Sequence, residues 1–120
     1  MPRFPIASRE KVPQDQVDAF DAIVSVRSGV VPEFGPVAVQ LHVPEIAQRG
    51  EALRAYLRAD GSTLPDNVAE LAMITTAREL DCQFIWHAHA AAGRRAGLSD
   101  ALVDALRDKQ ELPALSSAES

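Results

Sequence analysis

The sequence predicts an all-α protein, namely a compact helical domain with a central helical hairpin. We expect this domain to associate into an oligomer. Apolar residues recur at three- and four-residue spacing over most of the 120 residues, and Gly and Pro separate these stretches. Only 5% of the residues are aromatic. The core would therefore consist mainly of Ala, Leu, Val and Ile, and the modest apolar faces of such helices favour further burial between subunits. We expect an N-terminal arm over 1–13, one domain over 14–115 and a frayed tail over 116–120.

The first half of the chain predicts helices after an arm that contains three prolines. The arm is expected to be extended and to lie on another surface, such as a neighbouring subunit. A helical pattern begins at Gln14 and ends at Gly29. The apolar segment 37–43 fits a helix better than a strand, because a lone strand would have no pairing partner. Pro44 suits a helix start, and that helix is expected to end at Asp60-Gly61.

The second half predicts three more helices. Thr63 and Asp66 resemble a capping box, which would make Thr63 the N-cap of a helix that runs to about Leu80. The next helix is expected over 82–96. Ser99 would then cap a last helix.

Charge and cysteine content narrow the function classes. The net charge is -5 and the sequence pI is about 5.1, with no basic stripe, so a nucleic-acid partner is not expected. Cys82 is the single cysteine, which excludes an intramolecular disulfide and fits a reducing, cytoplasmic location. No apolar stretch approaches the roughly 20 residues of a membrane span, so no membrane partner is expected.

The second helical hairpin carries the candidate chemistry. Cys82 and His89 are seven residues apart, or about two helical turns, so they lie on nearly the same face of the helix. Ile85 and Trp86 share that face. A first-turn Cys82 would benefit from the positive end of the helix dipole. The helical rise separates the thiol and the imidazole by roughly 10 Å, so another group or a water would have to bridge them.

Glu70 lies on the preceding helix, twelve positions before Cys82. An antiparallel hairpin would turn it toward the 82–89 stripe, where a carboxylate, an imidazole and a thiol could form an acid–base set. Each member also has a structural interpretation: a buried inert cysteine, a packing or surface histidine, and a solvated glutamate. His87 and His89 point in different directions on a helix, so we expect no metal site.

Residues 63–113 resemble the carboxymuconolactone decarboxylase family, which also contains the alkylhydroperoxidase D-like proteins. The resemblance rests on four segments, namely Leu64-Pro65, Glu70–Arg78, Cys82–His89 and Ala96–Ser99. It implies an all-α fold of the alkylhydroperoxidase D-like type. It also implies assembly into a trimer or hexamer, with the site near a subunit interface.

Two branches of that family bear on the site. In the peroxidase branch a glutamate is followed twelve residues later by a C-x-x-C pair and then by a histidine. Glu70, Cys82 and His89 match three of these positions, whereas Ile85 stands at the second cysteine, so a dithiol cycle within one chain is not expected. Another branch has Glu-Trp-x-x-His on this helix, and here Trp86 and His89 match while Ile85 replaces the acid.

Three functions remain open from the sequence. The first is a cofactor-free acid–base lyase that acts on a small carboxylated lactone or similar acid, with Glu70 and His89 as the proton-transfer pair and Ile85 and Trp86 lining the substrate site. The second is a redox protein that uses Cys82 with a small thiol or a second subunit. The third is a binding or scaffold protein without the chemistry. The lyase ranks slightly ahead, because Ile85 removes the dithiol.

Overall fold

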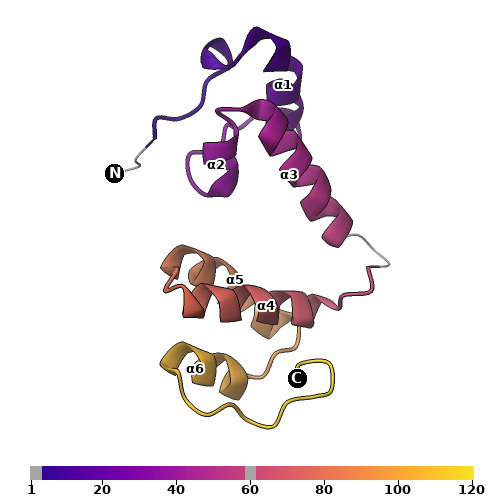
Figure 1. Ribbon diagram of the computed structural model, residues 1–120, viewed down its shortest axis with the longest axis vertical. Coiled ribbons are helices and arrows are strands. Elements are labelled where there is room, and N and C mark those ends of the chain that lie inside the picture. Colours follow the sequence, from indigo (N-terminus) through magenta and orange to yellow (C-terminus); the bar gives the residue numbers. More distant parts are fainter. Residues whose placement is uncertain (1–3, 59–61) are drawn as a thin grey trace. The chain divides into compact units, whose positions relative to one another are not determined.

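The computed structural model describes residues 4–58 and 62–120, in which the regular secondary structure is helical and no strand is present. The all-α prediction is thus confirmed. Internal contacts divide the chain into two compact units, unit 1 (Met1–Ala59) and unit 2 (Asp60–Ser120), and each is described by itself (Figure 1). One domain over 14–115 stays a prediction.

Unit 1 consists of short 3₁₀ turns followed by three helices. Its elements are η1 (Arg9–Lys11), η2 (Gln14–Gln16), α1 (Val17–Ser25), α2 (Pro36–Gln40) and α3 (Pro44–Leu57). Proline occupies the first position of both α2 and α3, where its missing N–H has no helical partner to lose. The segment expected as a helix near 37–43 is therefore α2.

The N-terminal arm packs on the core of its own unit, and its contact with a neighbouring subunit stays a prediction. Ala7 is buried in the core of unit 1, and the His42 Nε2–H donates to the carbonyl of Pro5 at 3.0 Å. The buried members of this core are Ala7, Phe20, Ile23, Leu41 and Ala47. The arm thus closes one side of this small core.

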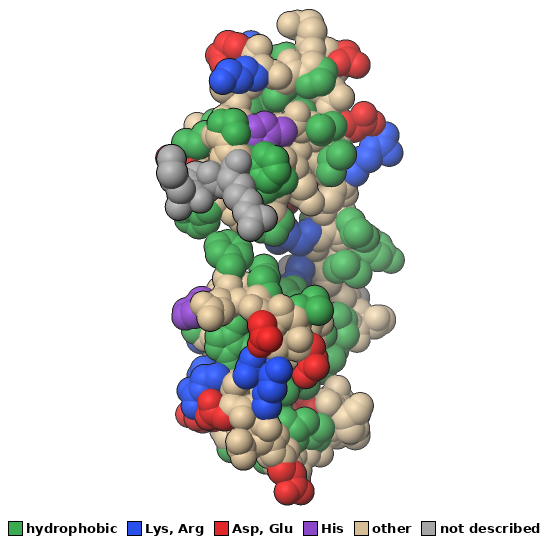
Figure 2. All heavy atoms as spheres, turned by 60° about the vertical axis from the view of Figure 1, so that its left-hand side comes forward, with side chains coloured by type: hydrophobic (Ala, Val, Ile, Leu, Met, Phe, Trp, Pro, Cys, Tyr) green, Lys and Arg blue, Asp and Glu red, His purple; other side chains and the backbone are tan. Residues whose placement is uncertain are grey.

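Helix α3 keeps much of its apolar surface exposed. Its buried residues are Pro44 and Ala47, near its start. Its second half carries the exposed side chains Leu53, Tyr56 and Leu57. Exposed hydrophobic side chains are visible on both units in Figure 2. The expected helix end at Asp60-Gly61 lies outside the described residues.

An ion pair in unit 1 predicts a pH-dependent stability. Arg54, with a further contribution from Arg27, holds the pKa of Glu51 below its usual range. Glu51 is mostly buried, with 19% of its side chain exposed, and the Arg27 Nη2 lies 3.0 Å from its Oε2. Because the folded pKa is lowered, this contribution is present above the unfolded pKa of about 4.3 and is lost as the pH falls through the folded value.

We expect Glu51→Gln to lower the free energy of unfolding at pH 7 by about 0.5–1 kcal/mol. The difference from the unsubstituted protein should be smaller at a second, acidic pH below the folded pKa of Glu51, where this carboxyl is protonated in both states. Urea unfolding followed by circular dichroism measures both values. Glu45→Gln, which removes an exposed pair with Arg49, is the control. An equal loss at both pH values for Glu51→Gln would contradict the assignment.

Unit 2 is a helical hairpin with a third helix packed on it. Helices α4 (Asp66–Glu79) and α5 (Gln83–Arg95) lie side by side, and α6 (Asp100–Asp108) packs against both (Figure 1). Asp81 adopts a left-handed φ of 48° at the turn, and the Cys82 N–H donates to the Ala77 carbonyl at 2.7 Å. The predicted break at Asp81 and the predicted hairpin are therefore present.

The predicted start of α4 at Thr63 is wrong. The helix begins at Asp66 after Pro65, and its N-cap makes no side-chain hydrogen bond. Pro65 explains the shift, because a residue that precedes proline is pushed away from helical backbone angles, which keeps Leu64 out of the helix. Asp66 is then the first helical residue, where a carboxylate interacts favourably with the helix dipole.

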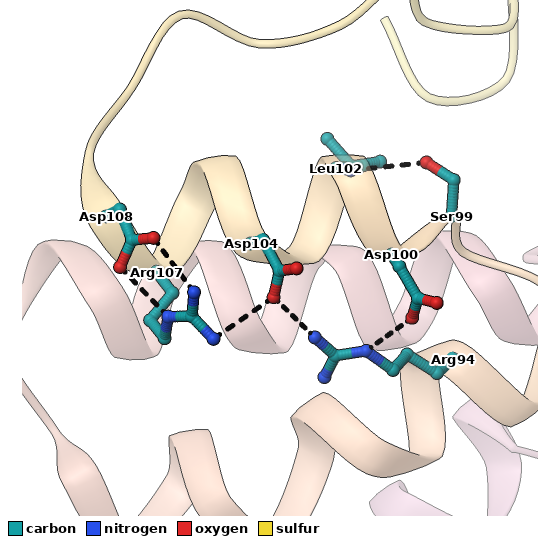
Figure 3. Close-up of polar contacts among 7 residues, drawn as sticks. All are labelled: Arg94, Ser99, Asp100, Leu102, Asp104, Arg107 and Asp108. Carbon is teal, nitrogen blue, oxygen red and sulfur yellow. Dashed lines mark hydrogen bonds and ion pairs between the residues drawn. The ribbon is translucent and has the colours of Figure 1, made fainter.

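Ser99 caps α6 as predicted. Its Oγ accepts from the Leu102 N–H at 3.2 Å (Figure 3). Ion pairs also connect α5 to α6, because Arg94 bonds Asp100 at 2.8 Å and Asp104 at 2.7 Å. Below them lies the buried core of unit 2, made of Ile74, Ala90, Leu98, Leu102 and Val103.

Candidate functional site

Glu70 and His89 form a hydrogen-bonded pair between α4 and α5. The His89 Nδ1 lies 2.8 Å from the Glu70 Oε2. Glu70 is only 4% exposed, whereas 26% of the His89 side chain is exposed. The arrangement is therefore a buried carboxylate that holds a partly accessible imidazole.

A close approach of the two helices positions this pair. Gly93 is one turn beyond His89 on α5 and is buried. A Cβ added there would lie 2.9 Å from the Leu98 Cδ1 and 3.6 Å from the Glu70 Cβ. The missing side chain at Gly93 thus leaves room for Glu70 and for the core residue Leu98 beneath it.

The pair has the geometry of an oriented acid–base group. When Glu70 is ionised, its carboxylate only accepts hydrogen bonds, and the His89 Nδ1–H is then the donor in this pair. The Nε2 then keeps a lone pair that can take up a proton, and the nearby carboxylate stabilises the imidazolium that results. Such a group can move a proton to or from a bound molecule without a metal.

Cys82 lies at the other end of α5. It is the N-cap residue, one position before the first helical residue, and it is partly exposed. A pocket of about 270 Å³ opens beside it, lined by Ala77, Arg78, Asp81, Cys82, Gln83, Trp86 and Arg107. Neither Glu70 nor His89 contributes to that lining. The structure thus brings two of the three expected residues into contact and places the thiol on a separate pocket.

The two expected substrate-site residues differ in their surroundings. Trp86 lines the pocket beside Cys82 and also packs against the core of unit 2. Ile85 is partly buried and does not line that pocket. His87 is exposed, and its Nδ1 is 2.7 Å from the Gln83 carbonyl. Within residues 4–58 and 62–120, no three His, Cys, Asp or Glu side chains gather in a way that could hold a metal ion.

The sequence pattern does not single out the two arginines that line this pocket, Arg78 and Arg107. Arg78 stands four residues before Cys82, so its closeness was readable from the chain. Arg107 comes from α6, 25 positions after Cys82, and only the packing of α6 on the hairpin brings it there.

None of the helices in the described parts of the chain is long and apolar enough to cross a bilayer.

The fold and the Glu70–His89 pair together define the class of protein, which is an all-α protein with a Glu–His pair between two antiparallel helices. The chain matches the carboxymuconolactone decarboxylase family over residues 44–120, more than half of its length. It therefore belongs to that family, as the resemblance indicated. The match covers α3 and all of unit 2, including the pair and Cys82. Comparisons with curated proteins and with solved structures give no match.

Proposed function

We propose that this protein is a cofactor-free acid–base lyase acting on a small carboxylated lactone or a related acid. His89 is the proton-transfer residue, and Glu70 orients it. The observation that supports this most is the 2.8 Å hydrogen bond between the His89 Nδ1 and the nearly inaccessible Glu70 carboxylate. Family membership supports the same reaction class.

The proposed chemistry needs one proton per turnover. When the carbon–carbon bond to the carboxylate breaks, CO₂ leaves and its bonding electrons remain on the ring carbon. The imidazolium of His89 donates its Nε2 proton to that carbon, and His89 then recovers a proton from water. The Glu70 carboxylate stabilises the charged imidazolium, which keeps the proton donor in place.

Turnover of small carboxylated lactones by two variants tests the proposal. CO₂ release and loss of lactone are measured together. We expect His89→Ala to lower turnover by about 10²–10⁴-fold, the usual contribution of a positioned acid–base group. Cys82→Ser should retain most of the activity, because Cys82 lines a pocket to which neither Glu70 nor His89 contributes. Absence of CO₂ release from the unsubstituted protein with every lactone, or unchanged turnover in His89→Ala, would contradict the proposal.

A thiol-based reaction is the second candidate, and the position of Cys82 favours it. The sulfur borders a pocket, at the amino end of a helix where the dipole supports a thiolate. In this reaction the thiolate would attack a peroxide oxygen, releasing an alcohol and leaving a sulfenic acid, which a small thiol would reduce. Loss of activity in Cys82→Ser but not in His89→Ala would favour this candidate. Peroxide reduction no faster than that of free cysteine would dismiss it.

A further inference from the structure

The pocket beside Cys82 has the features of a small binding site of its own. Ala77 and Trp86 supply an apolar wall, and Arg78 and Arg107 supply positive charge. One carboxylate, that of Asp81, also borders it. Its volume of about 270 Å³ is just below the lower end of the range of about 300–1,000 Å³ typical of ligand sites. A small ligand fits this space.

Arg107 is held in place from the side of α6. Asp108 binds it through two nitrogens at 2.9 Å each, and Asp104 lies 3.1 Å from its Nη1 (Figure 3). These carboxylates offset the charge of Arg107. Its main contribution to the pocket is therefore structural, since its backbone carbonyl accepts from the Arg78 Nε at 2.7 Å.

Arg78 is the cation that can bind a ligand. Its Nε is used by the Arg107 carbonyl, and its Nη1 lies 2.5 Å from the Asp81 Oδ1. The Nη2 has no hydrogen-bond partner in residues 4–58 and 62–120. Only 28% of the Arg78 side chain is exposed, whereas 73% of Asp81 is exposed. The guanidinium is thus fixed by two bonds and keeps one donor edge for an anion.

We propose that this pocket binds a small monocarboxylate, with Arg78 holding the carboxylate and the apolar part of the ligand against Ala77 and Trp86. A guanidinium donates to a carboxylate in a favourable planar geometry. Because Asp104 and Asp108 offset the charge of Arg107, the pocket offers the guanidinium of Arg78, which suits a ligand with one carboxylate. The proposal does not depend on the Glu70–His89 chemistry, because neither residue lines this pocket.

Cys82 reports directly on the charge preference of the pocket. Iodoacetate carries a carboxylate, whereas iodoacetamide of nearly the same size is neutral. Both attack the same sulfur, so the ratio of their rate constants cancels the intrinsic reactivity of the thiol. We expect this ratio to be about two- to fivefold higher for the intact protein than for N-acetylcysteine, as for one partly exposed ion pair.

Three single-residue variants separate local binding from general charge. Arg78→Gln should return the ratio to that of N-acetylcysteine, and Arg78→Lys should give an intermediate value. Arg95→Gln removes the same charge from the far end of α5 and should leave the ratio unchanged. Asp81→Asn should raise the ratio above that of the unsubstituted protein, because it removes a competing carboxylate. Asparagine tolerates the left-handed backbone at this position.

A competition experiment needs no variant. Sodium benzoate, compared with sodium chloride at equal ionic strength, should slow alkylation by both reagents in a saturable way. We expect saturable protection of the unsubstituted protein, together with the loss of the preference for iodoacetate in Arg78→Gln. A ratio equal to that of N-acetylcysteine, equal behaviour of Arg78→Gln and Arg95→Gln, or the absence of saturable protection would each overturn the proposal. None of these outcomes depends on whether His89 is catalytic.

Discussion

Replacing Glu70 with glutamine is expected to lower turnover by about 10²-fold, the lower end of what a positioned acid–base group contributes. Glutamine has nearly the same size, and its amide oxygen can still accept from the His89 Nδ1–H. The loss therefore comes from the missing negative charge, which no longer stabilises the imidazolium. The fold should persist, because the buried hydrogen bond to His89 survives.

Two readouts distinguish this role from a structural one. Turnover should fall in Glu70→Gln while the circular dichroism spectrum and the unfolding midpoint change little. Nitrogen NMR of His89 should still show a protonated Nδ1 in Glu70→Gln and a changed ring state in Glu70→Leu, which has no acceptor. Glu79→Gln, an equal charge change at an exposed position of α4, is the matched control. Equal turnover in the two glutamine variants would rule out an electrostatic role for Glu70.

Local patterns made most of the helices predictable. The αL position of Asp81, the cap at Ser99 and the prolines that open α2 and α3 are each decided by a few neighbouring residues. The start of α4 differs from the prediction because Pro65 acts against the capping-box pattern of Thr63 and Asp66. The steric effect of proline on the preceding residue is stronger than one side-chain cap, so the helix begins later.

The candidate site was predictable only in the part that one hairpin contains. Glu70 and His89 lie on consecutive helices, and the short turn at Asp81 forces those helices to pack antiparallel. Their contact therefore follows from spacing and helix periodicity. The pocket beside Cys82 needs α6 as well, and helix spacing carries no information on how a third helix crosses a hairpin. For the same reason the sequence did not reveal that Ala7 belongs to the core of unit 1.

Ile74→Ala is expected to lower the free energy of unfolding of unit 2 by about 2–4 kcal/mol. The Ile74 side chain is completely buried, among Ala90, Leu98, Leu102 and Val103. Ala90, Leu102 and Val103 come from helices already in contact, and Leu98 lies in the short connection between α5 and α6. These side chains therefore have little freedom to fill the cavity left by the deletion. Since a small domain is stabilised by only about 5–15 kcal/mol, the variant should unfold at a much lower urea concentration.

Trp86 makes this measurement local, because it is the single tryptophan and packs against the same core. Its fluorescence should show that Ile74→Ala unfolds at a lower urea concentration. For Ile74→Val the free energy of unfolding should fall by about 0.5–1.5 kcal/mol. Leu80→Ala truncates a side chain that is 75% exposed and should cost less than about 0.5 kcal/mol. Similar midpoints for Ile74→Ala and Leu80→Ala would contradict the packing described for unit 2.

Ile74 also separates stability from chemistry, since it stands one helical turn after Glu70 on the same face of α4. Ile74→Val removes one methyl group from the core and leaves the Glu70–His89 hydrogen bond intact. It should therefore lower stability while turnover at temperatures well below the unfolding transition is kept. Glu70→Gln should do the reverse. If both variants lost turnover in proportion to stability, the pair would act only as part of the packing between α4 and α5.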